Sequence, residues 1–274
     1  MRVEDLLIYG KSHCHSTHAK ILLAELLEKN PLELLLYLDD IVSEEKVNLY
    51  KQEIKALEEG KPLQYVLGYV NFYGTKFKID ERCLIPRFET EELVEQTIIK
   101  IKKYFSNPID IIDLGCGSGV IGLSLEKKVS TNTIDLVDIS KEALELTKEN
   151  INYLNSKANT IESDFFNKID KKYDVIISNP PYIKEKEEIE QIVKDNEPSI
   201  ALYGGEDGLD CYKKILENIT PHMKERCLIA FEIGCEQGEE ISSIAKEYLD
   251  DIKIEIKKDL QNRDRMLFIM KNLE

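Results

Sequence analysis

The sequence lacks several features that would place it in familiar protein classes. It has no tryptophan, and none of its six cysteines lies in a C-x-x-C pair, so neither a zinc knuckle nor a thioredoxin-like redox motif is expected. No apolar run approaches the roughly 18 residues of a membrane-spanning helix. The N-terminus also lacks the basic start, apolar segment and small-residue cleavage site of a secretory signal. We therefore expect a cytoplasmic protein with free thiols.

Positive charge is scarce in this chain. The 37 lysines and arginines are outnumbered by 52 acidic residues, which gives a net charge of −15. A protein that binds duplex nucleic acid normally presents a basic face to the phosphates, whereas the lysines here occur as dyads scattered among acidic residues. The charge therefore argues against a nucleic-acid partner. A length of 274 residues, 42% of them hydrophobic, fits one large globular domain or two moderate ones.

Apolar residues at helical spacing fill much of the first sixty positions. Capping residues and a proline mark the expected helix starts. The predicted helices run over residues 18–28 with Thr17 as N-cap, over 31–38 from Pro31 onward, and over 44–59 after Ser43, which begins a sequence resembling a capping box.

Two alternating runs, residues 69–73 and 76–79, flank Gly74 and predict a β-hairpin. We expect this hairpin to connect the helical part to a larger domain. The predicted domains are a helical bundle over residues 1–68, a hairpin linker over 69–86 and an α/β domain over 87–274.

Beyond residue 87 the pattern alternates between strand and helix, which predicts a doubly wound, mostly parallel seven-stranded sheet. The last two strands are too close for a helix between them, so we expect a hairpin with one antiparallel strand. The predicted strands are 109–114, 133–138, 159–163, 173–178, 227–233, 251–257 and 265–271, and the helices are 89–104, 118–127, 140–155, 208–222 and 236–248.

The residues Asn179-Pro180-Pro181-Tyr182 directly follow the predicted strand 173–178. A proline cannot donate to a ladder and restricts the residue before it to extended conformations. Asn179 is therefore expected at the carboxyl end of a strand, where open α/β sheets bind ligands. An amide side chain, a backbone carbonyl and an aromatic ring lie together there. They predict a site for a planar group with N–H donors, such as an amide or the amino group of a base.

A glycine-rich loop follows the predicted strand 109–114 and permits a tight turn with close backbone approach to a ligand. Asp138 ends the next strand, where a carboxylate can accept both hydroxyls of a ribose. Asp164 and Phe165 end the third strand and could bond to and stack on an adenine. The loop also fits the dinucleotide fingerprint through Gly122, so NAD, S-adenosylmethionine and a structural turn remain open here. Strand-end capping and core packing likewise remain open for Asp164 and Phe165.

The order of these motifs resembles the class I S-adenosylmethionine-dependent methyltransferases. Asn-Pro-Pro-Tyr marks the members that methylate a planar nitrogen, which include amino-methyltransferases of DNA and protein glutamine N5-methyltransferases. The rest of the chain looks like the second group, the release factor glutamine methyltransferase (PrmC/HemK) family. The resembling segments are 60–68, 84–91, 197–198, 204–209 and 231–234.

The chain departs from that family at two places. The family usually has Arg-Pro-Asp-Thr-Glu where this chain has Arg87-Phe88-Glu89-Thr90-Glu91, and tryptophan is frequent where this chain has Phe165. Both departures nearly preserve chemical type, so they weaken the transfer of single positions more than the assignment.

The resemblance implies methyl transfer from S-adenosyl-L-methionine to the side-chain nitrogen of the glutamine in the Gly-Gly-Gln motif of class 1 peptide release factors, leaving S-adenosyl-L-homocysteine. It implies that no metal takes part. It also implies that the helical N-terminal domain recognises the substrate and that the remaining domain transfers the methyl group. Nothing in the sequence indicates an obligate dimer, so we expect a monomer. The implied site residues are Asn179, Pro180 and Tyr182 as catalytic groups, with Pro181 beside them at the substrate, and Gly115, Cys116, Gly117, Ser118, Gly119, Asp138, Asp164, Phe165 and Asn179 at the cofactor.

Three other functions are open to the same motifs. An adenine-N6 methyltransferase of DNA or RNA uses the same acceptor geometry but usually carries a basic recognition domain. An NAD-dependent dehydrogenase leaves the double proline unexplained, and a non-catalytic adaptor leaves the intact Asn-Pro-Pro-Tyr unexplained. For His13, His15 and His18 we expect solvated or capping roles. Glu89 and Glu91 either favour a helix start or face the cofactor cleft.

Overall fold

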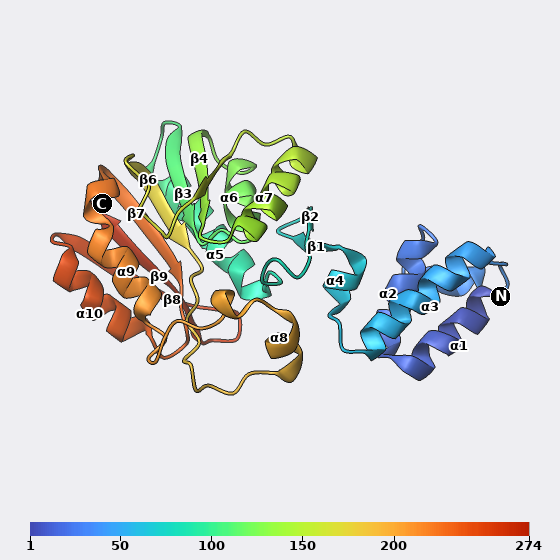
Figure 1. Cartoon of the computed structure of the whole chain (residues 1–274). Helices are drawn as coiled ribbons and strands as arrows, with labels where there is room; N and C mark the ends of the chain where they lie inside the picture. Colours follow the sequence, from blue (N-terminus) through green and yellow to red (C-terminus); the bar gives the residue numbers. More distant parts are fainter. Residues whose placement is uncertain (274) are drawn as a thin grey trace. The chain divides into compact units, whose positions relative to one another are not determined.

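The computed structural model describes residues 1–273, which form two compact units (Figure 1). The first unit comprises Met1–Tyr69 with Glu190–Asn196, and the second comprises Val70–Ile189 and the chain from Glu197 onward. Among the helices described, none combines the length and apolarity needed to cross a lipid bilayer.

The first unit is built on three helices that share a leucine-rich core. They are α1 (Val3–His13), α2 (Ser16–Leu26) and α3 (Glu44–Glu58), joined by the 3-10 helix η1 (Leu34–Tyr37) and followed by α4 (Leu63–Leu67). Tyr50 of α3 is fully buried, and its hydroxyl donates to the Ala19 carbonyl at 3.1 Å. At Gly10 a Cβ would lie 2.1 Å from that hydroxyl oxygen, so only glycine fits there. The short helix α8 (Gln191–Asn196) also belongs to this unit.

The predicted helices of this unit need three corrections. Helix α1 was not predicted. Thr17 is not the N-cap of α2: His15 is, because its Nδ1 accepts the Thr17 N–H at 3.3 Å. Residues 31–38 form turns and η1 rather than an α-helix; of their leucines only Leu34 is fully buried, Leu38 packs against the core, and Leu32, Leu35 and Leu36 are exposed. Ser43 caps α3 as predicted, but position 46 is a lysine, which cannot return the bond of a capping box.

The predicted hairpin is confirmed as β1 (Tyr69–Phe72) and β2 (Thr75–Lys78). Tyr73 and Gly74 in its turn both have positive φ, 46° and 73°, as a two-residue type I′ turn requires. Phe72 and Phe77 are buried in the same apolar cluster as the helix that follows.

The second unit contains the predicted seven-stranded sheet, with strand order β5-β4-β3-β6-β7-β9-β8. The strands are β3 (Ile109–Leu114), β4 (Thr131–Asp138), β5 (Asn159–Glu162), β6 (Tyr173–Ser178), β7 (Met223–Glu232), β8 (Ile252–Lys258) and β9 (Asp264–Lys271). Strand β9 alone runs antiparallel to its neighbours, which confirms the predicted terminal hairpin. The inner strands are apolar on both faces because helices cover both sides.

Helices cover the two faces of this sheet in two groups (Figure 1). On one face lie α5 (Phe88–Tyr104), α6 (Val120–Glu126) and α7 (Lys141–Leu154); on the other lie α9 (Asp210–Asn218) and α10 (Gly238–Tyr248). Two 3-10 helices, η2 (Ser199–Ala201) and η3 (Thr220–His222), lie in the connections. The strand order reverses between β3 and β6, so their carboxyl ends flank a topological switch point, where α/β sheets bind ligands.

Candidate active site

A cavity of about 380 Å³ opens at this switch point. Strands β3 and β6 pair in parallel with Leu114 opposite Ser178, so the glycine loop and Asn179 begin side by side. Ten of the residues predicted from sequence line the cavity or its loop: Gly115, Cys116, Gly117, Ser118, Asp138, Asp164, Phe165, Asn179 and Pro181 line it directly, and Gly119 continues the loop.

The glycine loop presents backbone, not side chains, to the cavity. Gly115 and Gly117 have positive φ, 71° and 54°, and a Cβ at either position would meet no atom within 4 Å. Both glycines line the cavity, so a side chain at either position would project into this open space and reduce the volume left for a ligand. Gly122 differs: a Cβ there would lie 2.3 Å from Leu136 Cδ2, so this glycine serves helix packing against β4. The open cradle fits a nucleoside-bearing ligand.

Asp138 stabilises the loop from the end of β4. Its two carboxylate oxygens accept the Gly117 and Ser140 N–H groups, each at 2.9 Å. Burial raises the pKa of Asp138, and these backbone bonds partly offset the rise. Each oxygen keeps a second lone pair, so the carboxylate can still accept the hydroxyls of a ribose.

Asp164 and Phe165 follow β5 and also line the cavity. Asp164 forms an ion pair with Lys214 of α9, and both residues line the cavity. Phe165 has a φ of 46°, which is unusual for a bulky residue and is typically retained at functional sites. Its neighbour Phe166 is instead buried and stacks on His222 with ring centroids 4.4 Å apart.

Asn179 is tied to two other elements by hydrogen bonds. Its Nδ2 donates to Thr90 Oγ1 at 3.2 Å, and Thr90 Oγ1 donates to Glu232 Oε2 at 2.7 Å. Thr90 lies in the first turn of α5, and Glu232 is the last residue of β7. Within residues 1–273 Asn179 Oδ1 has no hydrogen-bond partner. The amide oxygen is therefore available to a ligand.

The other residues of the motif lie around Asn179 in different ways. Pro181 lines the cavity, whereas Pro180 is buried and Tyr182 is mostly buried behind the lining. The Tyr182 hydroxyl is 3.5 Å from both Glu232 Oε1 and Arg265 Nη1. Burial, together with the nearby Glu232 carboxylate, raises the pKa of Tyr182.

Two glycines of the segment 204–209 pack against the backbone of the Asn-Pro-Pro-Tyr motif. A Cβ at Gly204 would lie 2.4 Å from the Pro181 carbonyl oxygen, and one at Gly208 would lie 2.3 Å from the Tyr182 carbonyl oxygen. Gln237 Nε2 also donates to the Tyr182 carbonyl at 3.0 Å. The backbone after Asn179 is thus held by close packing that side chains would prevent.

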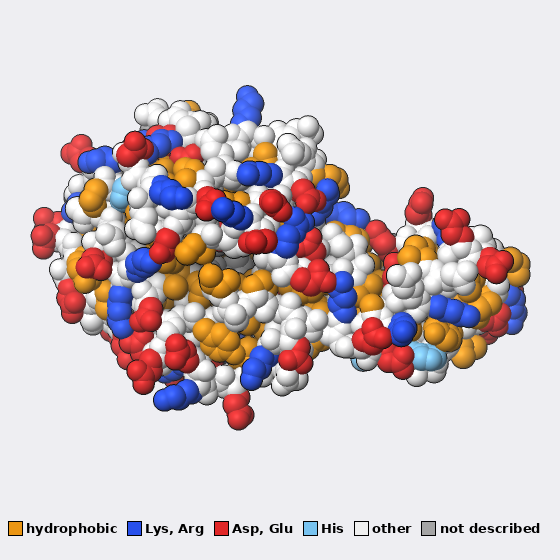
Figure 2. All heavy atoms as spheres, in the orientation of Figure 1, with side chains coloured by type: hydrophobic (Ala, Val, Ile, Leu, Met, Phe, Trp, Pro, Cys, Tyr) orange, Lys and Arg blue, Asp and Glu red, His pale blue; other side chains and the backbone are white. Residues whose placement is uncertain are grey.

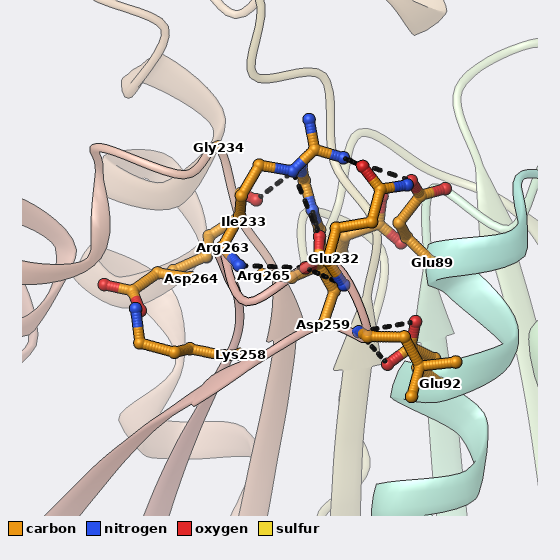
Figure 3. A network of polar contacts seen from close by, with 12 residues as sticks. Glu89, Glu92, Glu232, Ile233, Gly234, Lys258, Asp259, Arg263, Asp264 and Arg265 are labelled. Carbon is orange, nitrogen blue, oxygen red and sulfur yellow. Dashed lines mark hydrogen bonds and ion pairs between the residues drawn. The ribbon is translucent and has the colours of Figure 1, made fainter.

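A polar network extends behind Glu232 (Figure 3). Arg265 Nη1 donates to the Ile233 carbonyl at 3.1 Å, and its Nε lies 3.5 Å from Asp259 Oδ2. Arg263 bridges from Asp259 to Glu89 of α5, at 3.5 Å and 3.7 Å. Glu89 therefore joins this network, and neither it nor Glu91 lines the cavity. Thr90, which lies between them, does line the cavity and was not among the site residues predicted from the sequence.

Sequence reasoning also missed a wall made by two connecting segments. Leu84 and Pro86 line the cavity from before α5, and Pro198, Ile200 and Ala201 line it from the chain around η2. Glu197 ties the two segments together, because it accepts from the Ile85 N–H at 3.0 Å and from Arg87 Nη2 at 2.6 Å. Both segments carry the family resemblance, which was the available signal. The space-filling view shows apolar side chains gathered beside the hollow (Figure 2).

The histidines at positions 13, 15 and 18 belong to the first unit, and none of them lines the cavity. His15 caps α2, and the His13 ring contacts the Tyr9 carbonyl at 2.8 Å. In the part of the chain that is described, residues 1–273, no group of three or more histidine, cysteine or acidic side chains is arranged to hold a metal ion.

Comparison with known proteins identifies the family. Residues 98–196 match the Methyltransferase small domain and residues 15–68 match the PrmC N-terminal domain. The release factor glutamine methyltransferase of Bacillus cereus is 35% identical over 98% of this chain and 99% of its own length. The chain belongs to the release factor glutamine methyltransferase family. Its member from Clostridium botulinum is 35% identical over 97% of this chain and 98% of its own length, and that from Streptococcus pneumoniae is 37% identical over 84% and 82%.

Solved structures support the methyltransferase fold of this family member. The 16S rRNA N2 G1207 methyltransferase of T. thermophilus, in complex with AdoMet and guanosine, has a TM-score of 0.54 at 13% identity, covering 74% of this chain and 50% of that one. The ribosomal protein L11 methylase of Lactobacillus delbrueckii subsp. bulgaricus has a TM-score of 0.51 at 19% identity, covering 68% and 81%. At such identities the likeness concerns the fold alone.

Proposed function

We propose that this chain transfers a methyl group from S-adenosyl-L-methionine to the side-chain amide nitrogen of the glutamine in the Gly-Gly-Gln motif of class 1 peptide release factors. The observation that carries the proposal is the juxtaposition, in one cavity, of an open glycine cradle and the free amide oxygen of Asn179. Membership of the release factor glutamine methyltransferase family supports the substrate.

The cofactor side of the cavity would hold S-adenosylmethionine, which supplies a methyl group on a positively charged sulfur. Gly115, Cys116, Gly117, Ser118 and Gly119 give it close backbone contact, and Asp138 accepts from its ribose. Asp164 and Phe165 lie where an adenine could be bonded and stacked, once Asp164 shares or gives up its ion pair with Lys214. Asn179 borders both the cofactor and the acceptor.

The acceptor side would orient the substrate amide. An amide nitrogen is a weak nucleophile because its lone pair is delocalised, so the site must hold the nitrogen in line rather than deprotonate it first. Asn179 Oδ1 and the Pro180 carbonyl would each accept one N–H of the substrate, while Pro181 would border its flat face with the Tyr182 ring behind it. Such orientation can supply up to about 7–11 kcal/mol of the barrier in favourable cases, and aligned dipoles add to it as charge redistributes.

The N-terminal residues 1–68 would recognise the release factor, with the hairpin 69–86 leading to the methyltransferase part at 87–274. Four large apolar side chains in the segment between α2 and α3 support this role because they are exposed: Leu32, Leu35, Leu36 and Ile41. A charged replacement at Leu36, which is 79% exposed, should raise the KM for release factor without changing the affinity for S-adenosylmethionine. An unchanged KM would remove this surface from the docking site. We propose a cytoplasmic monomer.

The decisive test offers one labelled methyl donor to two acceptors. Purified full-length protein is incubated with S-adenosylmethionine carrying a labelled methyl group and either a class 1 release factor or duplex DNA. Label in the release factor, lost when its Gly-Gly-Gln glutamine is replaced by alanine, is the expected result. Label in adenine of the DNA would instead establish the amino-methyltransferase alternative, and label in neither would refute the proposal.

A further inference from the structure

We propose that Thr90 and Glu232 are positioning residues that determine which way the Asn179 amide faces, and thereby present its oxygen to the substrate. This inference rests on the proposed function and adds two residues to its machinery. The three side chains come from distant parts of the chain: Asn179 and Thr90 are 89 positions apart in the sequence, and Thr90 and Glu232 are 142 positions apart.

Hydrogen-bond valence fixes the direction of the bonds. A threonine hydroxyl has one hydrogen, and an ionised carboxylate can only accept. Thr90 therefore gives its hydrogen to Glu232 Oε2 and can only accept from Asn179, which must turn Nδ2 towards it. Asn179 Oδ1 then faces the other way. If the amide were reversed, Oδ1 would face a threonine oxygen with no hydrogen left to donate.

Burial of Thr90 and Glu232 strengthens their control over the orientation of the Asn179 amide. Thr90 and Glu232 are 3% and 1% exposed, so water has little access to replace a lost bond. Glu232 Oε1 faces the Tyr182 hydroxyl at 3.5 Å, and Arg265 reaches that hydroxyl from β9 at the same distance. The Glu232 carboxylate thus lies between the hydroxyl groups of Thr90 and Tyr182, and Arg265 of β9 supports it through the second of these.

The geometry also predicts how acid disrupts the arrangement. Burial raises the pKa of Glu232 to about 7; the bond from Thr90, the positive Arg265 and the Tyr182 hydroxyl oppose that rise, and the negative Glu89 adds to it. A proton on Oε2 makes Glu232 a donor to Thr90, so the threonine hydrogen turns to Asn179 and favours the reversed amide. Turnover should therefore fall on the acid side of this pKa.

The experiment compares Thr90→Val with Thr97→Val in the full-length protein. Thr97 is a matched control because it is buried in the same helix, but among residues 1–273 its hydroxyl bonds only to the Leu93 carbonyl within α5. Thr90→Val should lower kcat for release factor methylation by about 10–100-fold, as loss of the outer hydrogen-bond partners of metal ligands does in metal sites. The KM of Thr90→Val for release factor and its calorimetric affinity for S-adenosylmethionine should stay within about threefold of the wild-type values. Thr90→Ser, which keeps the hydroxyl, should retain most of the wild-type kcat.

The pH profile separates positioning from mere structural support. The wild-type and Thr97→Val proteins should lose kcat below an apparent pKa of about 7, whereas Thr90→Val and Glu232→Gln should lack this limb. Glu232→Gln keeps the side-chain volume, so it remains informative if Thr90→Val fails to fold. Equal kcat and equal pH profiles in Thr90→Val and Thr97→Val would overturn the proposal, as would an acid limb that persists in Glu232→Gln.

A second readout keeps this inference distinct from the proposed function. In protein labelled with nitrogen-15 at asparagine, one Asn179 Nδ2 proton should show the shift and slow exchange of a hydrogen bond, kept in Thr97→Val and lost in Thr90→Val. Its absence from the wild-type protein would overturn the positioning role. A wild-type protein that shows this signal but methylates no release factor would refute the function alone.

Discussion

The two halves of the cavity are built in different ways. The cofactor half, defined by Gly115–Gly119, Asp138, Asp164 and Phe165, is mostly backbone held by bonds between neighbouring strand ends, such as Asp138 to Gly117 and Ser140. The acceptor half, defined by Thr90, Asn179 and Glu232, is a chain of side chains from α5, β6 and β7. We therefore expect substitutions in the first half to weaken cofactor binding and substitutions in the second to lower the rate of transfer.

The buried acids Asp113 and Glu232 differ in their hydrogen-bond partners. Asp113 of β3 lies behind the glycine loop, where Oδ2 accepts the Gly122 N–H at 2.9 Å and Oδ1 has no partner within the described chain. Both oxygens of Glu232 face a hydroxyl group. Burial raises the pKa of each to about 7. Burial thus raises the pKa of both acids, although Asp113 bonds to the backbone of α6 and Glu232 to two side-chain hydroxyl groups.

Asn179→Ala should have the largest effect and should separate the two halves. Methyl transfer should fall by about 10²–10³-fold, the loss in kcat that removal of one preorganised polar group at a reacting centre causes. Cofactor affinity, measured by calorimetry, should remain within about tenfold because the glycine loop is untouched. Asn132→Ala, at an exposed position of β4, is the control. Near-normal turnover of Asn179→Ala would remove the residue from the mechanism.

Asp138→Ala tests the other half. Without the carboxylate, the Gly117 and Ser140 N–H groups lose their acceptor and the ribose loses its partner. Affinity for S-adenosylmethionine should fall by about 100-fold, or nearly 3 kcal/mol, with a much smaller effect on kcat at saturating cofactor. Asp170→Ala, at an exposed position, should leave the affinity unchanged. Equal affinities of the two variants in calorimetry would refute the assignment.

The stability of the protein should depend on pH through Asp113 and Glu232. Their folded-state pKa values of about 7 exceed the ordinary values of 3.8 and 4.5, so the folded state holds more protons between these limits. The free energy of unfolding should therefore fall as pH rises from about 4 to 7, by on the order of 6 kcal/mol from these two groups together. Urea unfolding at several pH values measures this slope. Asp113→Asn should flatten it, and an unchanged slope would show that Asp113 does not titrate in this range.

Lys214→Ala should have the smallest effect. Its ion pair with Asp164 is partly exposed, with side chains 44% and 30% accessible, and such pairs contribute about 0–1 kcal/mol. The melting temperature should change by less than about 3 °C, and cofactor affinity should stay the same or rise slightly because Asp164 is freed. A marked loss of affinity would show that Lys214 itself contacts the cofactor.

Periodicity and turn residues predicted most of the fold. All seven sheet strands and the terminal hairpin were predicted because buried β-branched runs and glycine turns are local signals. Helix α1 and the 3-10 segment η1 were not, because their form depends on contacts such as the Val3 N–H to Asp40 carbonyl bond, which no local pattern reveals.

The site residues likewise divide into those that local sequence patterns predict and those that only the folded structure brings together. The glycine loop, Asp138 and Asn179 each follow a predicted strand, so sequence order alone placed them at one sheet edge. Thr90 and Glu232 are an ordinary helix threonine and strand glutamate in the sequence, and only the folded chain joins them to Asn179. The role of Pro180 and Tyr182, which lie behind the cavity lining, remains a prediction from the motif.

Mass spectrometry of the methylated substrate tests the central claim most directly. A class 1 release factor is incubated with the full-length protein and S-adenosylmethionine, and its fragments are sequenced. The account predicts one added methyl group, located on the side-chain nitrogen of the Gly-Gly-Gln glutamine and missing when Asn179→Ala replaces the wild-type protein. A methyl group on any other residue, or an unmodified release factor beside an active control enzyme, would contradict it.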